Sequence, residues 1–280
     1  MPAKKFISPE IKKNTIEELS KQLLKTNAEL HKLQEEREIM FANISHDLRA
    51  PMTAIRSALD LALSEDKDEI TKEELRSALE LIDRRSKTLE SLVNDMYYLY
   101  RVSNVSEEYH FENIEVIPFL EEYYYDLLAD TKYDGFEIKL DIEDIPEDTC
   151  IDIDPQKIVR VLDNLFTNAV KYSVKENADG TTKKNQIKLK ARCNTEIFPN
   201  KLVISVIDNG PGIPEKDLPF VFMRTYMVSE ARTPETGKTG SGLGLSIAKT
   251  IIEKHNGSIE CISEINKWTE FIIRLPMCVK

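Results

Sequence analysis

Residues 45–51 read Ser-His-Asp-Leu-Arg-Ala-Pro and set a histidine directly before an acid. A carboxylate such as Asp47 can accept the Nδ1 proton of the His46 imidazole and leave Nε2 as a free nucleophile. Pro51 removes a backbone hydrogen bond just after this pair and loosens a helix there. An exposed histidine on a helix is usually only a solvated residue, so this segment alone leaves both interpretations open.

A second group of polar side chains shares one face of an expected helix. Asn164 and Asn168 are four residues apart, with Lys171 beside them. Asparagine is disfavoured inside helices because its side chain competes with the backbone, so two on one face indicate a polar ligand. Carboxamide oxygens suit a hard cation such as Mg²⁺, and the ammonium suits phosphate. A solvated helix face is the alternative.

Two glycine-bearing segments can bring backbone close to a ligand. Asp208 follows an apolar strand and precedes Gly210 and Gly212, so its carboxylate can accept a hydrogen bond from an exocyclic amine. A tight turn explains that segment equally well. Residues 237–245 open a helix, whose N–H groups and dipole favour an anion. They are not a Walker A loop, because that motif needs a glycine where Arg232 stands and a strand directly before it.

The first hundred residues must position His46, and they are expected to form long helices. They contain no glycine, and Pro51 is their only proline after Pro9. Apolar residues recur at steps of three and four over about four heptads, which predicts a coiled coil. Its core positions are Ile16, Leu19, Leu23, Thr26, Leu30, Leu33, Arg37, Met40 and Ile44. With Ile44 inward, His46 falls on the outer face. The alternative is one amphipathic helix packed on a globular domain.

A second helix is expected after a polar turn at residues 64–68. Thr71 and Glu74 have the spacing of a capping box at its start. Its expected buried stripe is Leu75, Leu79, Ile82, Leu89, Val93, Met96 and Leu99. Two antiparallel helices bury little by themselves, so the hairpin predicts a homodimer in which two chains form a four-helix bundle.

The composition changes after about residue 103, where glycine and β-branched runs first appear and proline becomes more frequent. Helices are expected at 117–132, 155–172 and 243–255. Strands are expected at 136–142, 150–153, 186–193, 201–208, 258–262 and 268–275. Mixed strands with helices on one face predict an α/β two-layer sandwich. The expected domains are a coiled-coil signalling helix at 1–39, a helical hairpin at 40–103 and the sandwich at 112–280.

Charge and composition exclude several classes of function. A formal net charge of −11 argues against a nucleic-acid partner, because phosphate contacts need a surplus of Lys and Arg. No apolar run approaches the ~18 residues that span a bilayer, and no signal peptide begins the chain, so membrane contact within it is not expected. The four cysteines are scattered, which argues against a disulfide framework or zinc site and suits a reducing cytosol.

In their order and spacing, these segments resemble the sensor histidine kinases of two-component systems over residues 40–276. The resemblance rests on five motifs: the H box, N box, first glycine box, F box and second glycine box. They correspond to residues 46–51, 164–173, 208–212, 220–226 and 240–245. It implies an α+β protein in which a coiled coil and a dimeric four-helix bundle precede an ATP-binding domain of the Bergerat type.

The resemblance also implies a role for each polar residue. His46 would take the γ-phosphoryl group of ATP, with Asp47 positioned as its base, and pass it to an aspartate of a response regulator receiver domain. Asn168 would hold Mg²⁺, while Asn164 and Lys171 would lie near the phosphates. The implied cofactors are therefore ATP and Mg²⁺, and the implied activity is that of a protein-histidine kinase.

The resemblance also implies which residues contact the adenine ring and which belong to the lid over the nucleotide. Asp208 would receive the adenine amino group, and Tyr172 would flank the ring. The other nucleotide-binding residues that the resemblance implies are Gly210, Gly212, Arg224, Tyr226, Gly240, Ser241, Gly242, Leu243 and Gly244. Thr225 and Met227 depart from the aromatic and basic residues common in the F box.

Position 50 is Ala50, where many members carry a Thr or Asn that positions water for dephosphorylating the regulator, so weak phosphatase activity is expected. The sequence shows no sensor, membrane span or receiver domain. Either Met1 begins a piece of a longer protein or the signal arrives through another subunit. The expected location is the cytoplasm, as a free protein or as the cytoplasmic part of a membrane-bound sensor.

Two other functions compete with this interpretation. Gyrase-type and chaperone ATPases share the nucleotide fold, but they lack a phospho-accepting hairpin such as the one that carries His46. A non-catalytic dimerising scaffold is the second alternative, and intact Asn168 and Asp208 argue against it.

Overall fold

The computed structural model describes residues 9–63, 71–103, 107–173, 185–194, 201–223, 226 and 242–277. Its contacts divide the chain into two units, residues 1–50 and 51–280. This division falls inside the first helix, so the domain boundaries expected at 39/40 and between 103 and 112 stay predictions. The polar turn expected at 64–68 lies outside the described residues.

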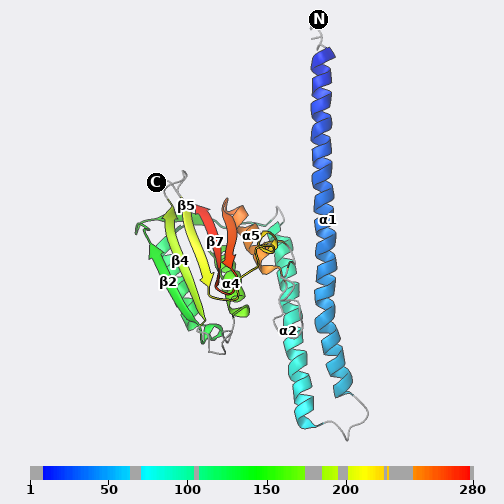
Figure 1. Ribbon diagram of the computed structural model, residues 1–280, viewed down its shortest axis with the longest axis vertical. Coiled ribbons are helices and arrows are strands. Elements are labelled where there is room, and N and C mark those ends of the chain that lie inside the picture. Colours follow the sequence, from blue (N-terminus) through cyan, green and yellow to red (C-terminus); the bar gives the residue numbers. More distant parts are fainter. Residues whose placement is uncertain are drawn as a thin grey trace. The chain divides into compact units, whose positions relative to one another are not determined.

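Helix α1 spans Pro9–Ala62 and continues through Pro51 (Figure 1). Leu19, Leu23 and Leu30 lie on the predicted coiled-coil seam, and more than half of each is exposed, with Leu23 at 65%. Exposing such a stripe to water is unfavourable, so a second helix covering it would stabilise the chain. None of the described helices contains an apolar stretch long enough to cross a lipid bilayer.

Helix α2 spans Lys72–Ser103 and begins with the predicted capping box. The Glu74 carboxylate accepts hydrogen bonds from the Thr71 N–H (2.8 Å) and hydroxyl (2.9 Å), and the Glu74 N–H donates to the Thr71 hydroxyl (3.2 Å). These bonds lower the pKa of Glu74. The predicted stripe is only partly covered in the single chain, because Leu99 is buried whereas Leu79 is 57% exposed.

The predicted two-layer sandwich is confirmed. Its sheet has the order β2-β4-β5-β7-β6, in which β2 and β4 are parallel and the other neighbours antiparallel. The strands are β2 Glu137–Glu143, β4 Gln186–Asn194, β5 Lys201–Asp208, β6 Ser258–Glu264 and β7 Trp268–Pro276. Helices α4 (Pro155–Lys171) and α5 (Gly244–Lys254) cover one face (Figure 1), where Leu202 and Ile204 of β5 are fully buried.

A small second sheet was not anticipated. Strand β1 (Glu112–Glu115) pairs antiparallel with β3 (Cys150–Ile153), and only β3 was predicted. Three of the four β1 residues are polar, so only the pairing with a distant segment makes this stretch a strand. Helix α3 is also shorter than predicted: it spans Val116–Ala129, because Asp130 begins a separate 3₁₀ turn by accepting the Lys132 N–H at 2.9 Å.

Helix α4 is fixed at its start and along its buried face. Asp154 caps it by accepting the Lys157 N–H at 3.1 Å, and Pro155 suits the first helical position. Phe166 is fully buried, and the rings of Tyr123 and Tyr133 meet it edge-on, with centroids 5.8 and 6.1 Å away. The exposed side of α4 is therefore held in a defined orientation.

The C-terminal part of α2 packs on α4 through a cation–aromatic contact. The Arg160 guanidinium lies 3.5 Å from the centroid of the Tyr98 ring, and its Nη2 is 3.4 Å from the Asp95 carboxylate. Lys157 approaches the same ring at 5.2 Å. Partly desolvated contacts of this type contribute about 1–2 kcal/mol, so they help to fasten α2 to the sandwich.

His255 ends α5 and is 2% exposed. Its Nε2 accepts the Asp154 N–H at 3.0 Å and its Nδ1–H donates to the Ile251 carbonyl at 2.8 Å, so the neutral ring satisfies both contacts. Burial lowers the pKa of His255 below its ordinary value of 6.5. The C-terminal end of α5 is thereby tied to the start of α4.

This histidine predicts a pH dependence of stability. Below about pH 6.5 the unfolded chain binds a proton that the folded chain resists, so the free energy of unfolding should fall as the pH decreases. Urea unfolding between pH 5.5 and 8 measures this slope. His255→Gln should be less stable at pH 7.5 but show a flatter profile, whereas His110→Gln, at an exposed histidine, should keep the wild-type slope. An unchanged slope in His255→Gln would contradict the prediction.

Candidate functional site

His46 lies on α1 with 76% of its side chain exposed, whereas neighbouring Ile44 is buried, as predicted. Its Nδ1 is 3.3 Å from the Asp47 carboxylate. Because a carboxylate can only accept, Nδ1 carries the proton in this contact and the lone pair is on Nε2. Pro51 offers no N–H to the Asp47 carbonyl four residues earlier. The imidazole is thus oriented and accessible.

The N box lies on α4, in the other unit. The Asn164 amide donates to the Gly244 carbonyl at 3.1 Å and so joins this helix to the start of α5. Asn168 lies one turn further along and is partly exposed. Tyr172 ends the helix, and the Lys171 ammonium lies 4.7 Å from the centroid of its ring. Asn164 therefore helps to position the start of α5 against α4. The four-residue spacing of Asn164 and Asn168 did not indicate this role.

Asp208 is the last residue of β5 and is only 9% exposed. Its Oδ1 accepts the Gly210 N–H at 2.8 Å, which bends the chain sharply at the strand end. A Cβ at Gly210 would lie 2.5 Å from that same oxygen, so glycine is needed to keep this arrangement. The carboxylate is thereby held in a fixed position at the C-terminal end of β5, the central strand of the sheet.

Gly212 fits against the turn between β6 and β7. Its φ is +72°, and a Cβ there would meet the Glu264 carbonyl oxygen at a clashing distance. The Pro211 carbonyl accepts the Asn266 N–H at 2.6 Å, and the Ile213 N–H donates to the Ser263 hydroxyl at 2.9 Å. The glycine loop is therefore fastened to a turn more than fifty residues away in sequence.

Gly212→Ala is expected to destabilise the protein by about 2–4 kcal/mol, since alanine would adopt a left-handed backbone and press on rigid main chain. Gly135→Ala is the matched control: its φ is +88°, but a Cβ there meets nothing within 4 Å, so only the backbone strain of about 1 kcal/mol applies. Urea unfolding of both variants measures the difference. Equal losses would contradict the close approach at Gly212.

The start of α5 has the features of an anion site. Gly242 has a φ of +62°, and Leu243, at the N-cap position, is fully buried and makes no side-chain capping hydrogen bond. Ser246 turns its hydroxyl to the Leu243 carbonyl at 2.8 Å. The positive end of the helix dipole lies at this turn and favours an anion.

The structure brings three of the predicted motifs together. Asn164 bonds to Gly244, and a Cβ on Gly210 would lie 3.6 Å from the Tyr172 carbonyl. The N box thus contacts the start of the second glycine helix at one of its ends and the first glycine box, beside Asp208, at the other. His46 belongs to the other unit.

Two residues near Asp208 were not identified from the sequence. Thr269 of β7 is directly opposite Asp208 in the sheet and is buried, and its hydroxyl lies 3.2 Å from the Ser263 hydroxyl. A polar residue at an inward strand position was the signal that could have revealed it. Cys261 of β6 is the second: burial, with a smaller contribution from Asp208, raises the pKa of its thiol to about 12.

The F box is described only in part. The Tyr226 hydroxyl donates to the Asp217 carboxylate at 2.7 Å, and the Phe222 ring meets Phe271 of β7 edge-on at 6.2 Å. Among the nucleotide-binding residues that the resemblance implies, Arg224, Gly240 and Ser241 lie outside the described residues, so their roles stay predictions.

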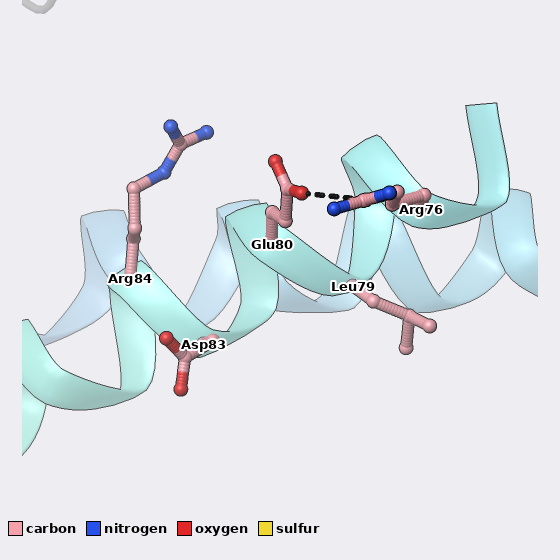
Figure 2. Close-up of a pocket in the computed structure, with 5 residues that line it drawn as sticks. All are labelled: Arg76, Leu79, Glu80, Asp83 and Arg84. Carbon is pink, nitrogen blue, oxygen red and sulfur yellow. Dashed lines mark hydrogen bonds and ion pairs between the residues drawn. The ribbon is translucent and has the colours of Figure 1, made fainter. Parts of the chain in front are cut away.

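A shallow hollow of about 470 Å³ on α2 is separate from these motifs. Figure 2 shows its lining residues: Arg76, Leu79, Glu80, Asp83 and Arg84. Arg76 and Glu80 form an ion pair one helical turn apart, with Nε and Oε1 3.1 Å from each other. Exposed pairs of this kind form a solvated helix face and contribute little to stability.

Comparison with known families assigns the two parts of the chain separately. Residues 36–104, which include His46, match the His Kinase A (phospho-acceptor) domain. Residues 153–278 match the histidine kinase-, DNA gyrase B- and HSP90-like ATPases. The second range contains the N box, both glycine boxes and Thr269, so the part of the chain around Asp208 is an ATP-binding domain.

Curated relatives carry both parts in this order. The sensor histidine kinase WalK of Bacillus subtilis (strain 168) is 35% identical over 249 residues, which cover 89% of this chain and 38% of that protein. The sensor protein kinase WalK of Staphylococcus aureus (strain MRSA252) is 34% identical over 251 residues, with the same coverage. The chain thus spans less than half the length of these relatives.

Solved structures share the fold. Histidine kinase ThkA in complex with response regulator protein TrrA aligns over 98% of this chain and 68% of that chain, with a TM-score of 0.63 and 22% identity. Acinetobacter baumannii histidine kinase AdeS aligns over 84% and 98%, with a TM-score of 0.55 and 22% identity. A phospho-acceptor hairpin followed by an ATPase sandwich, together with the identity to WalK, shows that the chain belongs to the sensor histidine kinases.

Proposed function

We propose that this chain transfers the γ-phosphoryl group of ATP to His46 and then to an aspartate of a response regulator. The observation that carries the proposal is that α4 contacts both glycine segments: Asn164 bonds to Gly244, and Gly210, beside the buried carboxylate of Asp208, lies against Tyr172 at the end of the helix. This arrangement suits a nucleotide, since one helix connects an acceptor for an amine with a helix start that favours phosphate. The proposed reaction also requires an accessible nucleophilic side chain, and His46 is one.

The transfer is a displacement at phosphorus. The Nε2 lone pair of His46 forms the N–P bond while the bond from the γ-phosphorus to the β–γ bridging oxygen breaks, and ADP leaves with that electron pair. The imidazole becomes positively charged during attack. Asp47, 3.3 Å from Nδ1, stabilises that charge and holds the Nδ1 proton. Asp47 therefore acts by orientation and electrostatics within the acceptor helix.

Asp208 would accept the adenine amino group, with Thr269 beside it in the sheet, and Tyr172 would flank the ring. Lys171 and the first turn of α5 would lie near the phosphates, with Asn164 holding that turn in place. Phosphoryl transfer depends mainly on positioning and charge neutralisation, which these groups supply. Gly210 and Gly212 keep the loop close enough for this arrangement.

Asn168 would hold Mg²⁺ through its carboxamide oxygen. The donor chemistry fits, because the side chain is partly exposed on the face of α4 that also carries Asn164, and Mg²⁺ prefers oxygen ligands shared with substrate phosphates. When bound, the ion neutralises negative charge on the transferring phosphoryl group.

The proposed partners are a second copy of this chain and a receiver domain. A dimeric coiled coil would cover the exposed apolar residues of the first part of α1, such as Leu23, and a four-helix bundle would cover those of α2, such as Leu79. The relative ThkA is known in complex with the response regulator TrrA, which supports a receiver domain as the second partner.

Incubation with γ-labelled ATP and Mg²⁺ tests the proposal. The wild-type chain should take up label that survives alkali and is lost in acid, as expected of a phosphohistidine, and it should pass label to a purified receiver domain. Absence of label, with nucleotide bound under the same conditions, would refute the kinase function.

Ala50 predicts weak phosphatase activity. It lies four residues after His46 on the same face of α1 and is exposed, and its methyl group cannot position a water molecule. Ala50→Thr should accelerate loss of label from a phosphorylated regulator at least about tenfold, because a hydroxyl can orient the attacking water. Ala42→Thr, an exposed site four residues before His46, should have no effect. Rapid dephosphorylation by the wild-type chain would contradict the prediction.

A further inference from the structure

Asp217 carries a carboxylate that is almost completely buried. The residue lies between the first glycine box and the F box and is 7% exposed, although its neighbours Glu215 and Lys216 are exposed. Its Oδ1 accepts the Tyr226 hydroxyl at 2.7 Å, while its buried Oδ2 has no hydrogen-bond partner among the described residues. Burying a charge is unfavourable unless hydrogen bonds or opposite charges compensate it, so loss of the hydrogen bond from Tyr226 should be strongly unfavourable.

The backbone of Asp217 is fixed by hydrogen bonds on both sides. The Asp217 N–H donates to the Pro214 carbonyl at 2.8 Å, and the Asp217 carbonyl accepts the Phe220 N–H at 3.0 Å. The Phe220 and Tyr226 rings pack with centroids 5.6 Å apart. Tyr226 therefore contacts the described residues 217–220 twice, through the hydrogen bond to Asp217 and through the ring of Phe220.

The segment 217–223 is also attached to the sheet beside the nucleotide site. Phe222, within this segment, packs edge-on against Phe271 of β7, two residues from Thr269. The segment starts five residues after Gly212, whose loop is fastened to the β6–β7 turn. A change in the geometry of residues 217–223 would therefore act on Phe271 of β7 and, along the chain, on the Gly212 loop.

We propose that Asp217 and Tyr226 are positioning residues, whose hydrogen bond sets the geometry of the nucleotide site by holding residues 217–223 against the sheet. This rests on the proposed ATP-dependent function. Because a phenol has one proton and the Tyr226 proton goes to Asp217, Tyr226 acts through this segment and does not donate a hydrogen bond to the nucleotide. Asp217 is absent from the residues that the family resemblance implied.

Three variants separate this role from simple packing. Tyr226→Phe removes the donor and leaves a buried carboxylate with neither oxygen bonded, which is the most damaging state. Asp217→Asn keeps a carbonyl that can accept from Tyr226 and removes the charge, so it should be mild. In the double variant no charge is left uncompensated, so Asp217→Asn should partly rescue Tyr226→Phe.

Autophosphorylation kinetics and the dissociation constant of a fluorescent ATP analogue test the proposal. We expect Tyr226→Phe to raise KM for ATP and the dissociation constant about tenfold, with kcat changed less than about twofold. Asp217→Asn should stay within about threefold of wild type, because its carbonyl still accepts from Tyr226. The double variant lacks the hydrogen bond but leaves no buried charge, so its dissociation constant should lie between those of Asp217→Asn and Tyr226→Phe. Tyr125→Phe, at an exposed tyrosine of the same domain, should not differ from wild type.

Unchanged KM in folded Tyr226→Phe, or additive losses in the double variant, would overturn the proposal. If Tyr226→Phe does not fold, the double variant carries the test, and its failure to fold would also overturn it. A wild-type chain that binds the analogue without taking up label would refute the kinase function instead. The dissociation constants of the variants would then still decide whether the pair positions the site.

Discussion

Replacement of His46 by glutamine is expected to abolish labelling by γ-labelled ATP, to less than about 1% of wild type, because no other group replaces the nucleophile. The His46 side chain is exposed and its Nδ1 proton is directed to Asp47, so Nε2 is the attacking atom. Glutamine keeps a similar polarity and length but has no nucleophilic nitrogen. Nucleotide affinity should not change, since His46 belongs to the unit 1–50 and Asp208 to the unit 51–280.

His31→Gln is the matched control, because His31 is also an exposed histidine on α1. It should take up label at the wild-type rate. Label retained by His46→Gln, with the same acid lability as in wild type, would show that another histidine is the acceptor. The dissociation constant for ATP, measured in the same preparations, separates loss of the acceptor from loss of the fold.

Asp208→Asn is expected to weaken ATP binding about 10- to 100-fold, which corresponds to the loss of a hydrogen bond to a charged acceptor. The asparagine carbonyl can still accept the Gly210 N–H, so the loop should keep its shape. The amide N–H₂ would then replace the oxygen that faces the adenine amino group, and two donors would oppose each other. Labelling should fall in parallel at ATP concentrations below the new dissociation constant.

Asp126→Asn, at an exposed aspartate on α3, is the matched control and should bind ATP like wild type. Comparison of ATP with GTP sharpens the test, because guanine presents a carbonyl where adenine presents its amine. The preference for ATP over GTP should shrink in Asp208→Asn. An unchanged preference would mean that Asp208 does not contact the base, whatever the change in affinity.

Much of this protein follows from local features of the sequence. The helical periodicity places Ile44 inward and His46 outward, and the Thr71–Glu74 capping box marks a helix start. The apolar run at 202–207 predicts β5 and leaves Asp208 at its end. Each of these inferences needs only neighbours within a few residues, which is the range over which backbone geometry repeats.

The contacts that assemble the site join distant segments, and only the tertiary structure decided them. Asn164 bonds to Gly244, which is eighty residues away in the sequence, and Asp208 of β5 pairs with Thr269 of the neighbouring strand β7. Strand β1 exists because β3 lies beside it, and the Tyr226 hydroxyl donates to Asp217, nine residues earlier in the sequence. A local window contains the chemistry of each side chain but not its partner, since the partner depends on the path of the whole chain through the core.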